Sequence, residues 1–248
     1  MQIYDKPVRE LFHDFVQEQG IRKDDIVTRD DVVTWFESKY PKIKQGTIAA
    51  HLLRMSVNAP SRIHYSVRKD GSDDLFFQID SHKFRLYDTG RDPIPIYSAE
   101  DTNAPNEADI SISEQIEYER EFAYERDLKN FLAKNMGIIE PGLCLYEEEE
   151  VKGIEYPAGG RFIDLLGIDK KNNLVVIELK VSKGYDRVIG QLLRYIAWIK
   201  KNLAEPVQRV RGVIIASIIS EDLKLAASEI SDISLFEYDL SISLRRVT

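Results

Sequence analysis

Apolar residues recur three and four positions apart in three segments near the N-terminus, which is the spacing of one face of a helix. These segments are residues 7–19, 30–40 and 46–57. Gly20 and Pro41 follow the first two, and both residue types commonly end helices. Three strand-like segments come next, around the turn-forming sequence KDGSDD: residues 64–68, 74–80 and 82–88. Three helices followed by a β-hairpin predict a winged helix-turn-helix domain.

The second half of the chain alternates helical and strand patterns. In chain order we expect a helix, three strands, a helix, a strand, a helix and a terminal strand region, over residues 114–135, 143–151, 160–169, 174–181, 185–203, 210–217, 221–230 and 233–247. The segment LVVIELKV is apolar enough for a strand buried on both faces, and the short turn KKNN joins it to the preceding strand as a hairpin. This order predicts an αβββαβ core with a mixed sheet, so the whole chain is expected to be a two-domain protein of the α/β (α+β) class.

The stretch between the two patterned regions is rich in acidic, proline and small polar residues and has no sustained apolar periodicity, which is typical of a linker. Residues 96–124 carry eight acidic side chains and one basic side chain, so most of the net charge of −8 lies there. We therefore divide the chain into an N-terminal domain (1–95), an acidic linker (96–116) and a C-terminal domain (117–248). Keeping the linker extended is the favoured role of these acids, and an autoinhibitory strip in a DNA groove is the alternative.

No apolar run approaches the length of a membrane span, and the first ten residues lack the apolar core of a secretory signal. The chain is therefore expected to be cytoplasmic and to have no contact with a membrane. Its single cysteine cannot form an internal disulfide.

The N-terminal domain has no acidic residue between Glu37 and Asp70 but several basic ones. In a winged helix this stretch contains the third helix and the first strand of the wing, which meet the major groove and the neighbouring phosphates. We therefore expect DNA contacts from six of these basic residues, which are Lys42, Lys44, Arg54, Arg62, Arg68 and Lys69. The alternative is a protein-docking module, because a run of one charge sign can also be an ordinary solvated face.

Three ionisable residues fall on the predicted central hairpin. Asp164 lies in the middle of one strand, while Glu178 and Lys180 are two positions apart on the next and so point to the same face. Charges in so apolar a strand need a partner, because burial of an unpaired charge is costly. A structural ion pair is the alternative, since the tripeptide Glu-x-Lys is common. The strand context, with Gln191 and Tyr195 four residues apart on the following helix, favours a catalytic site.

Mg²⁺ or Mn²⁺ is the partner that these residue types suit best. Hard divalent cations take carboxylate and carbonyl oxygens, which Asp164, Glu178 and the backbone carbonyl of Leu179 could supply. Lys180 would then orient or deprotonate an attacking water and neutralise charge on a phosphate in the transition state. The pattern therefore predicts metal-dependent hydrolysis of phosphodiester bonds.

Four segments together resemble the C-terminal nuclease domain of the NucS endonuclease family, within the PD-(D/E)XK superfamily: YERDLKNFLAKN, IEPGLCLYEEE, GGRFIDLLGIDKKNNLVVIELKVSKG and IGQLLRYIAWIKKNL. The resemblance covers about residues 117–216. It implies that Asp164, Glu178 and Lys180 occupy the catalytic positions and that Glu125 is a further carboxylate supplied by a helix. It also implies that Gln191 belongs to the site, with Tyr195 next to metal and DNA, and that Arg161 contacts phosphate.

The resemblance stops at the N-terminal half, because NucS proteins carry a β-rich domain where this chain has a predicted winged helix. A winged helix joined to a PD-(D/E)XK domain is similar in layout to Mrr-like restriction enzymes, so host defence and DNA repair both stay open. So do cleavage of RNA or of mismatched, flapped or single-stranded DNA. A DNA-binding regulator or complex subunit whose nuclease fold no longer cuts is the alternative from another class. If the product is a double-strand break, a homodimer is expected, because each chain has one site.

Overall fold

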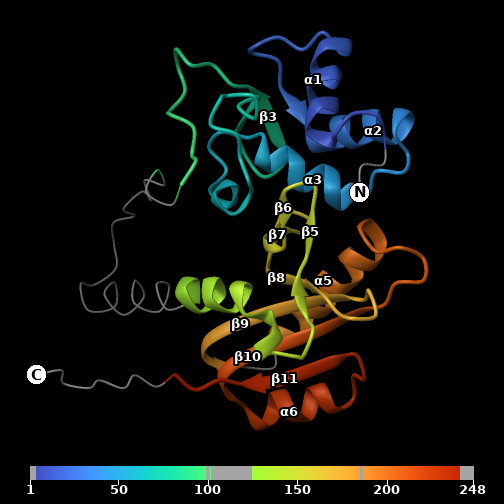
Figure 1. The fold of residues 1–248 in the computed structure, drawn as a ribbon, viewed down its shortest axis with the longest axis vertical. Coiled ribbons are helices and arrows are strands. Elements are labelled where there is room, and N and C mark those ends of the chain that lie inside the picture. The colour runs from blue at the N-terminus through green and yellow to red at the C-terminus, as the bar shows by residue number, and fades with distance from the viewer. Residues whose placement is uncertain (1–3, 99–100, 102–124, 185–186, 241–248) are drawn as a thin grey trace, which may run out of the picture.

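The computed structural model describes residues 4–98, 101, 125–184 and 187–240, without the side chains of residues 181–184 (Figure 1). The predicted linker, residues 96–116, lies mostly outside these residues. The described ranges contain no helix that is both long enough and apolar enough to cross a membrane.

The N-terminal domain contains three helices and a small three-stranded sheet. The helices are α1 (Val8–Glu18), α2 (Arg29–Lys39) and α3 (Gln45–Arg54), and the strands are β1 (Val27–Thr28), β2 (Phe76–Gln78) and β3 (Lys83–Leu86). The strands pair in the order β1-β3-β2, and both pairs are antiparallel. Thr28 accepts a hydrogen bond from the backbone N–H of Asp31, whose carboxylate in turn accepts one from the backbone of Thr28. This capping box fixes the start of α2.

Two details of this domain differ from the sequence-based expectation. Residues 64–68 were predicted to form a strand, but the chain instead makes a short 3₁₀ helix, η1 (Pro60–His64), and continues without regular structure. Strand β1 was not predicted, because two residues are too few to show a period. The predicted hairpin is present as β2 and β3.

The C-terminal domain is built on a six-stranded mixed sheet in the order β11-β10-β9-β8-β4, with β7 also paired to β8. The strands of its centre are β7 (Ile154–Pro157), β8 (Phe162–Ile168), β9 (Leu174–Gly184) and β10 (Val210–Ile219). Strands β7, β8 and β9 are antiparallel neighbours, whereas β9, β10 and β11 (Ile233–Glu237) run parallel. The mixed sheet is as predicted.

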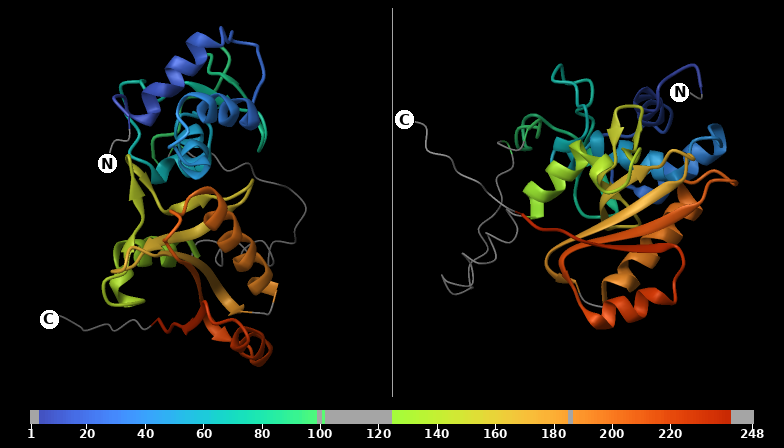
Figure 2. Two further views of the ribbon diagram at one scale, coloured as in Figure 1. Left: turned by 90° about the vertical axis from the view of Figure 1, so that its right-hand side faces the viewer. Right: turned by 60° about the horizontal axis from the view of Figure 1, so that its bottom comes forward.

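Helices cover both faces of this sheet (Figure 2). Helix α5 (Arg187–Asn202) packs against β9 and β10, with α6 (Glu221–Ser228) beside it. The helix over residues 125–134 packs its apolar side chains against the opposite face, where Leu165, Ile177 and Val213 lie. Because side chains alternate along a strand, Glu178 then points to the α5 face.

The predicted strand over 143–151 is in fact three short strands. They are β4 (Cys144–Leu145), on the edge of the large sheet, and β5 (Glu147–Glu148) and β6 (Val151–Lys152), which form a hairpin of their own. Glu149 and Glu150 make the turn with φ of 46° and 68°. The left-handed region is costly for residues with a Cβ, so the turn needs support from outside the hairpin.

That support comes from the N-terminal domain, onto which the β5–β6 hairpin docks (Figure 1). The carboxylate of Glu149 accepts a hydrogen bond from the backbone N–H of Val8, at the start of α1, at 2.8 Å, and that of Glu148 accepts one from the Thr47 hydroxyl on α3 at 2.7 Å. Helix α3 also contacts β7 and α5, and nine of its ten residues are buried. The two domains are therefore packed together through the helix that was expected to face DNA.

Candidate active site

Asp164 and Glu178 lie side by side on neighbouring antiparallel strands. The pairing of Leu165 with Ile177 continues one step outward and places Asp164 opposite Glu178. The backbone N–H of Leu179 donates to Oδ2 of Asp164 at 2.8 Å, which fixes this carboxylate against β9. Lys180 follows two residues after Glu178, and its Nζ lies 2.8 Å from Oε1 of Glu178. The three residues therefore converge as the sequence predicted.

Glu178 is the most buried member of this group, with 2% of its surface exposed. Its Oε1 accepts hydrogen bonds from Lys180 and from Nε2 of Gln191, the latter at 2.6 Å. Its Oε2 is buried and has no hydrogen-bond partner among the described residues. Gln191 also lies 3.3 Å from the hydroxyl of Tyr195, so α5 holds one side of the carboxylate.

The electrostatics of the site follow from burial and from the two close carboxylates. Burial, followed by the neighbouring charge of Asp164, raises the pKa of Glu178 to about 7. Burial also raises the pKa of Asp164, against the opposing effects of the Leu179 N–H and the charges of Lys129 and Lys180. Burial alone would lower the pKa of Lys180, but the Glu178 carboxylate outweighs it and the net pKa is raised. Burial makes the charged forms of both carboxylates unfavourable in this site, while the lysine stays protonated. A bound cation would stabilise the two charged carboxylates.

The donors present fit a magnesium-type ion that is held partly by its substrate. The described residues contain no group of three or more His, Cys, Asp or Glu side chains placed to hold a metal. Magnesium is commonly bound by only one or two carboxylates, with water and phosphate oxygens completing the octahedron. The unpartnered Oε2 of Glu178 and the carboxylate of Asp164 are two such oxygens, and the carbonyl of Leu179 remains the predicted third.

Glu125, the helical carboxylate implied by the resemblance, is the first described residue of the helix over 125–134. Its charge contributes, after larger effects, to raising the pKa of both Glu178 and Lys180. The helix therefore brings Glu125 toward the Asp164 and Glu178 pair.

Arg161 is exposed at the turn that leads into β8. Gly159 and Gly160 form this turn with φ of 62° and 81°, a conformation that favours glycine. Tyr195, in contrast, is 2% exposed and packs in the core. The expectation that Tyr195 contacts DNA is wrong, because its ring is buried and its hydroxyl accepts a hydrogen bond from Gln191.

Sequence reasoning missed a second polar group beside Asp164. Nζ of Lys129, on the helix over 125–134, lies 2.6 Å from Oε1 of Glu155 on β7, and Nε2 of His64 lies 3.5 Å from Oε2 of the same carboxylate. The pairing of β7 with β8 places Glu155 between paired residues and opposite Asp164. Lys129 could have been found from the sequence, because it lies four residues after Glu125 on one helix face. Nothing in the sequence singles out Glu155 or His64.

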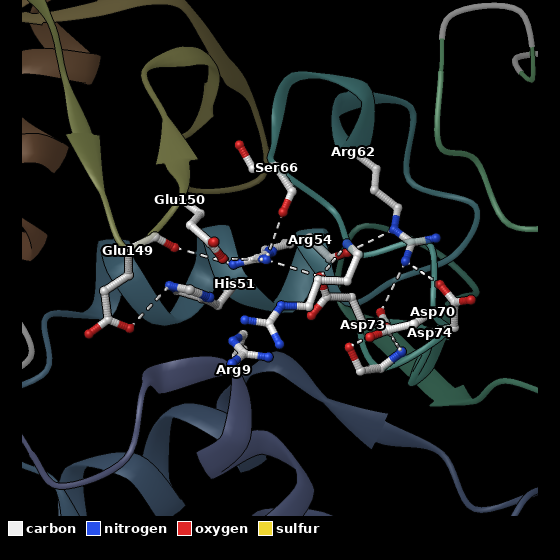
Figure 3. Close-up of polar contacts among 12 residues, drawn as sticks. Arg9, His51, Arg54, Arg62, Ser66, Asp70, Asp73, Asp74, Glu149 and Glu150 are labelled. Carbon is white, nitrogen blue, oxygen red and sulfur yellow. Dashed lines mark hydrogen bonds and ion pairs between the residues drawn. The ribbon is translucent and has the colours of Figure 1, made fainter.

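Two of the predicted DNA-contacting arginines are structural instead (Figure 3). Arg54 and Arg62 are completely buried. Arg54 pairs with Asp73 at 3.0 Å and with Glu150 of the docked hairpin at 2.8 Å, and Arg62 pairs with Asp74. The prediction that these two arginines bind phosphate is wrong, because Arg54 connects the N-terminal domain to the hairpin and Arg62 is bonded within the N-terminal domain.

The other four basic residues that were predicted to contact DNA differ in their exposure. Lys44 is half-buried, and its Nζ lies 3.5 Å from Glu205 of the C-terminal domain. Lys42, Arg68 and Lys69 are exposed. Only these three remain available to a nucleic acid in the way that the sequence predicted.

Two family models match the chain. Residues 7–86 match a domain of unknown function (DUF7669), and residues 124–238 match the endonuclease NucS C-terminal domain. Endonuclease NucS of Pyrococcus abyssi is 32% identical over 102 residues, which are 40% of this chain and 36% of that protein. Endonuclease NucS of Sulfolobus acidocaldarius is 35% identical over 98 residues, 40% and 35% of the two chains. The chain thus spans little more than a third of the length of these relatives.

Solved structures give a weaker likeness. A repair endonuclease from Pyrococcus abyssi matches with 22% identity and a TM-score of 0.37, over 63% of this chain and 56% of that one. The structure of an EndoMS–dsDNA complex matches with 21% identity and a TM-score of 0.37, over 63% and 54%. The matched range of the NucS family model, residues 124–238, includes Asp164, Glu178 and Lys180. The chain therefore carries a NucS-like C-terminal domain, in residues 124–238.

Proposed function

We propose that the protein is a metal-dependent DNA endonuclease that hydrolyses phosphodiester bonds at Asp164, Glu178 and Lys180. The observation that carries this proposal is the buried Glu178 carboxylate beside the partly buried Asp164 carboxylate, because Oε2 of Glu178 has no hydrogen-bond partner among the described residues. A fold kept only for binding has no need of so costly a feature. The relatives that share this domain are named as endonucleases, which supports the same reading.

A bound Mg²⁺ or Mn²⁺ supplies charge neutralisation and lowers the pKa of water. Asp164, Glu178 and the carbonyl of Leu179 would hold it. Lys180 is firmly protonated, so it suits orienting the attacking water and neutralising the phosphate better than taking a proton. Gln191 keeps Glu178 in place through its 2.6 Å hydrogen bond.

We also propose that the N-terminal domain is a winged helix, on the basis of its three helices and its β1-β3-β2 sheet. Its third helix is covered by the C-terminal domain, so DNA would contact other parts of the surface. Arg161 and the exposed residues Lys42, Arg68 and Lys69 are the candidates. DNA repair and restriction both suit such an enzyme, and cutting both strands would require a homodimer.

A substrate panel tests this function. The purified chain is incubated with linear, nicked, mismatched, flapped and single-stranded DNA and with RNA, in Mg²⁺ or Mn²⁺ and in EDTA, beside Asp164→Asn. We expect cleavage of at least one DNA substrate that EDTA and Asp164→Asn both abolish. If wild type and variant are equally inert on every substrate while duplex DNA is still bound, the protein is a binding subunit with a silent nuclease fold.

A further inference from the structure

A chain of polar contacts connects the N-terminal domain to the nuclease site. It begins at His64 in η1, passes through Glu155 on β7 and ends at Lys129 on the helix over 125–134. These residues come from three elements that are far apart in sequence. None of them has a place in the proposed chemistry so far.

The Lys129–Glu155 pair lies beside Asp164, and its lysine is shielded from solvent. The Lys129 side chain is 8% exposed, and its Nζ lies 2.6 Å from Oε1 of Glu155. Strand pairing sets Glu155 opposite Asp164, and both Lys129 and Glu155 act electrostatically on the Asp164 carboxylate. Lys129 thus forms an ion pair with Glu155 and also acts electrostatically on Asp164.

His64 holds that carboxylate from the other domain. Its side chain is 10% exposed, and its Nε2 lies 3.5 Å from the second oxygen of Glu155. The η1 helix that carries His64 packs against β7, which fixes the distance between the domains at this point. Glu155 also has φ of 46°, so outside contacts must keep it in this conformation.

We propose that His64, Glu155 and Lys129 are positioning residues of the nuclease site, through which the N-terminal domain sets the charge and placement of Asp164. This proposal rests on the proposed function. With Glu155 in place, the Lys129 ammonium is neutralised and Asp164 is left for a divalent cation. Without Glu155, the ammonium turns to Asp164 and competes with that cation. Docking of the two domains is then a condition for metal binding.

Manganese affinity is the direct readout, measured by calorimetry on the metal-stripped full-length chain. Glu155→Gln should weaken Mn²⁺ binding by about tenfold, the scale for residues that orient metal ligands. Lys129→Met should tighten it, and Glu155→Gln should have little effect in the Lys129→Met background, because the freed ammonium is gone. His64→Ala should weaken binding by roughly threefold and His64→Gln should restore it, since an amide N–H can still donate to Glu155. His13→Ala is the control, because His13 is exposed and bonds only within its own domain.

Two results would overturn the proposal. One is Mn²⁺ affinity in His64→Ala and Glu155→Gln equal to that of His13→Ala, and the other is an undiminished effect of Glu155→Gln in the Lys129→Met background. A metal-free urea denaturation cycle of His64→Ala and Glu155→Gln tests the interdomain contact itself, and additive effects would refute it. If the effects of His64→Ala and Glu155→Gln on the free energy of unfolding are not additive but the protein binds no Mn²⁺, the interdomain contact stands and the metal-dependent nuclease function is refuted.

Discussion

At the scale of single residues, Glu178 is the most buried of the three residues of the candidate site. Keeping its carboxylate charged there costs folding free energy. A carboxylate that is 2% exposed, beside the partly buried carboxylate of Asp164, destabilises the fold when both are charged. The sequence placed Glu178 and Lys180 on one face, because residues two positions apart in a strand share a face, and it placed Asp164 on the neighbouring strand of the predicted hairpin. It did not reveal Glu155 or His64, because an acid on a short edge strand and a histidine at the end of a short 3₁₀ helix look like ordinary surface residues.

The pKa of Glu178 makes a prediction about stability. Its value of about 7 in the folded protein exceeds its ordinary value of 4.5, so the folded state binds the proton more tightly. The free energy of unfolding should therefore fall as the pH rises from about 4.5 to about 7. Without divalent cations, Glu178→Gln should be more stable than wild type at pH 8 by on the order of 1–2 kcal/mol, and not at pH 4. Urea denaturation at both pH values checks this, with the exposed Glu229→Gln as control. Equal pH dependence in both variants would contradict it.

Arg161 makes a prediction about DNA binding, because it is exposed at the turn that leads to Asp164. Arg161→Ala should weaken binding of all duplex sequences alike and reduce the slope of log affinity against log salt by about one. The matched control is Lys171→Ala, in the turn at the opposite end of β8. Fluorescence anisotropy across a salt series measures both. A slope unchanged in Arg161→Ala would remove Arg161 from the DNA surface.

At the scale of elements, the periodicity of apolar residues predicted the helices and the long strands. It did not predict the two-residue strands, which are too short to show a period. The segment 143–151 was predicted as one strand because its apolar and acidic residues contain no glycine or asparagine to mark a turn. Its reversal at Glu149 and Glu150 depends on contacts of Glu149 with Val8 and Arg54, which lie 141 and 95 residues away in the chain. Such a turn is determined by tertiary packing, which a local pattern does not contain.

Arg54 should affect stability and not DNA recognition. Arg54→Met leaves Asp73 as a buried carboxylate without its cation and removes the partner of Glu150. Breaking a buried pair in this way costs roughly 3–5 kcal/mol, which chemical denaturation would measure against the exposed Arg68→Ala. DNA affinity per folded molecule should stay the same. A stable Arg54→Met variant with weakened DNA binding would return Arg54 to the DNA surface.

Alanine substitutions at two glycines should change the stability of the protein in opposite directions. A Cβ at Gly153 would lie 2.2 Å from the carbonyl oxygen of Leu166, while a Cβ at Gly190 in α5 would meet nothing within 4 Å. Gly153→Ala should therefore destabilise the protein severely, because β8 backbone has to move. Gly190→Ala should stabilise it by about 0.5–1 kcal/mol through the better helix propensity of alanine. Thermal unfolding compares them, and a stable Gly153→Ala variant would show that the hairpin adapts.

At the scale of the whole molecule, the two domains are packed as one body across α3. The sequence indicated the mixed sheet correctly, but it suggested an N-terminal domain that contacts DNA through its third helix. Arg54 and His51 look like the polar edge of a solvated helix, and only the packed structure shows that both are fully buried. Burial lowers the pKa of His51 to about 3, helped by the charges of Arg54 and Arg9, so this interface stays neutral at His51. The N-terminal domain is therefore packed against the domain that contains Asp164, Glu178 and Lys180.

The central claim is that Asp164, Glu178 and Lys180 form a working nuclease site, and Lys180 tests it most directly. The measurement is single-turnover cleavage of a duplex DNA in Mg²⁺, with Lys180→Ala compared to Lys171→Ala and to wild type. We predict that Lys171→Ala cuts like wild type and that Lys180→Ala cuts about a hundredfold or more slowly while DNA affinity is kept. Equal cleavage rates in Lys180→Ala and wild type would contradict the account.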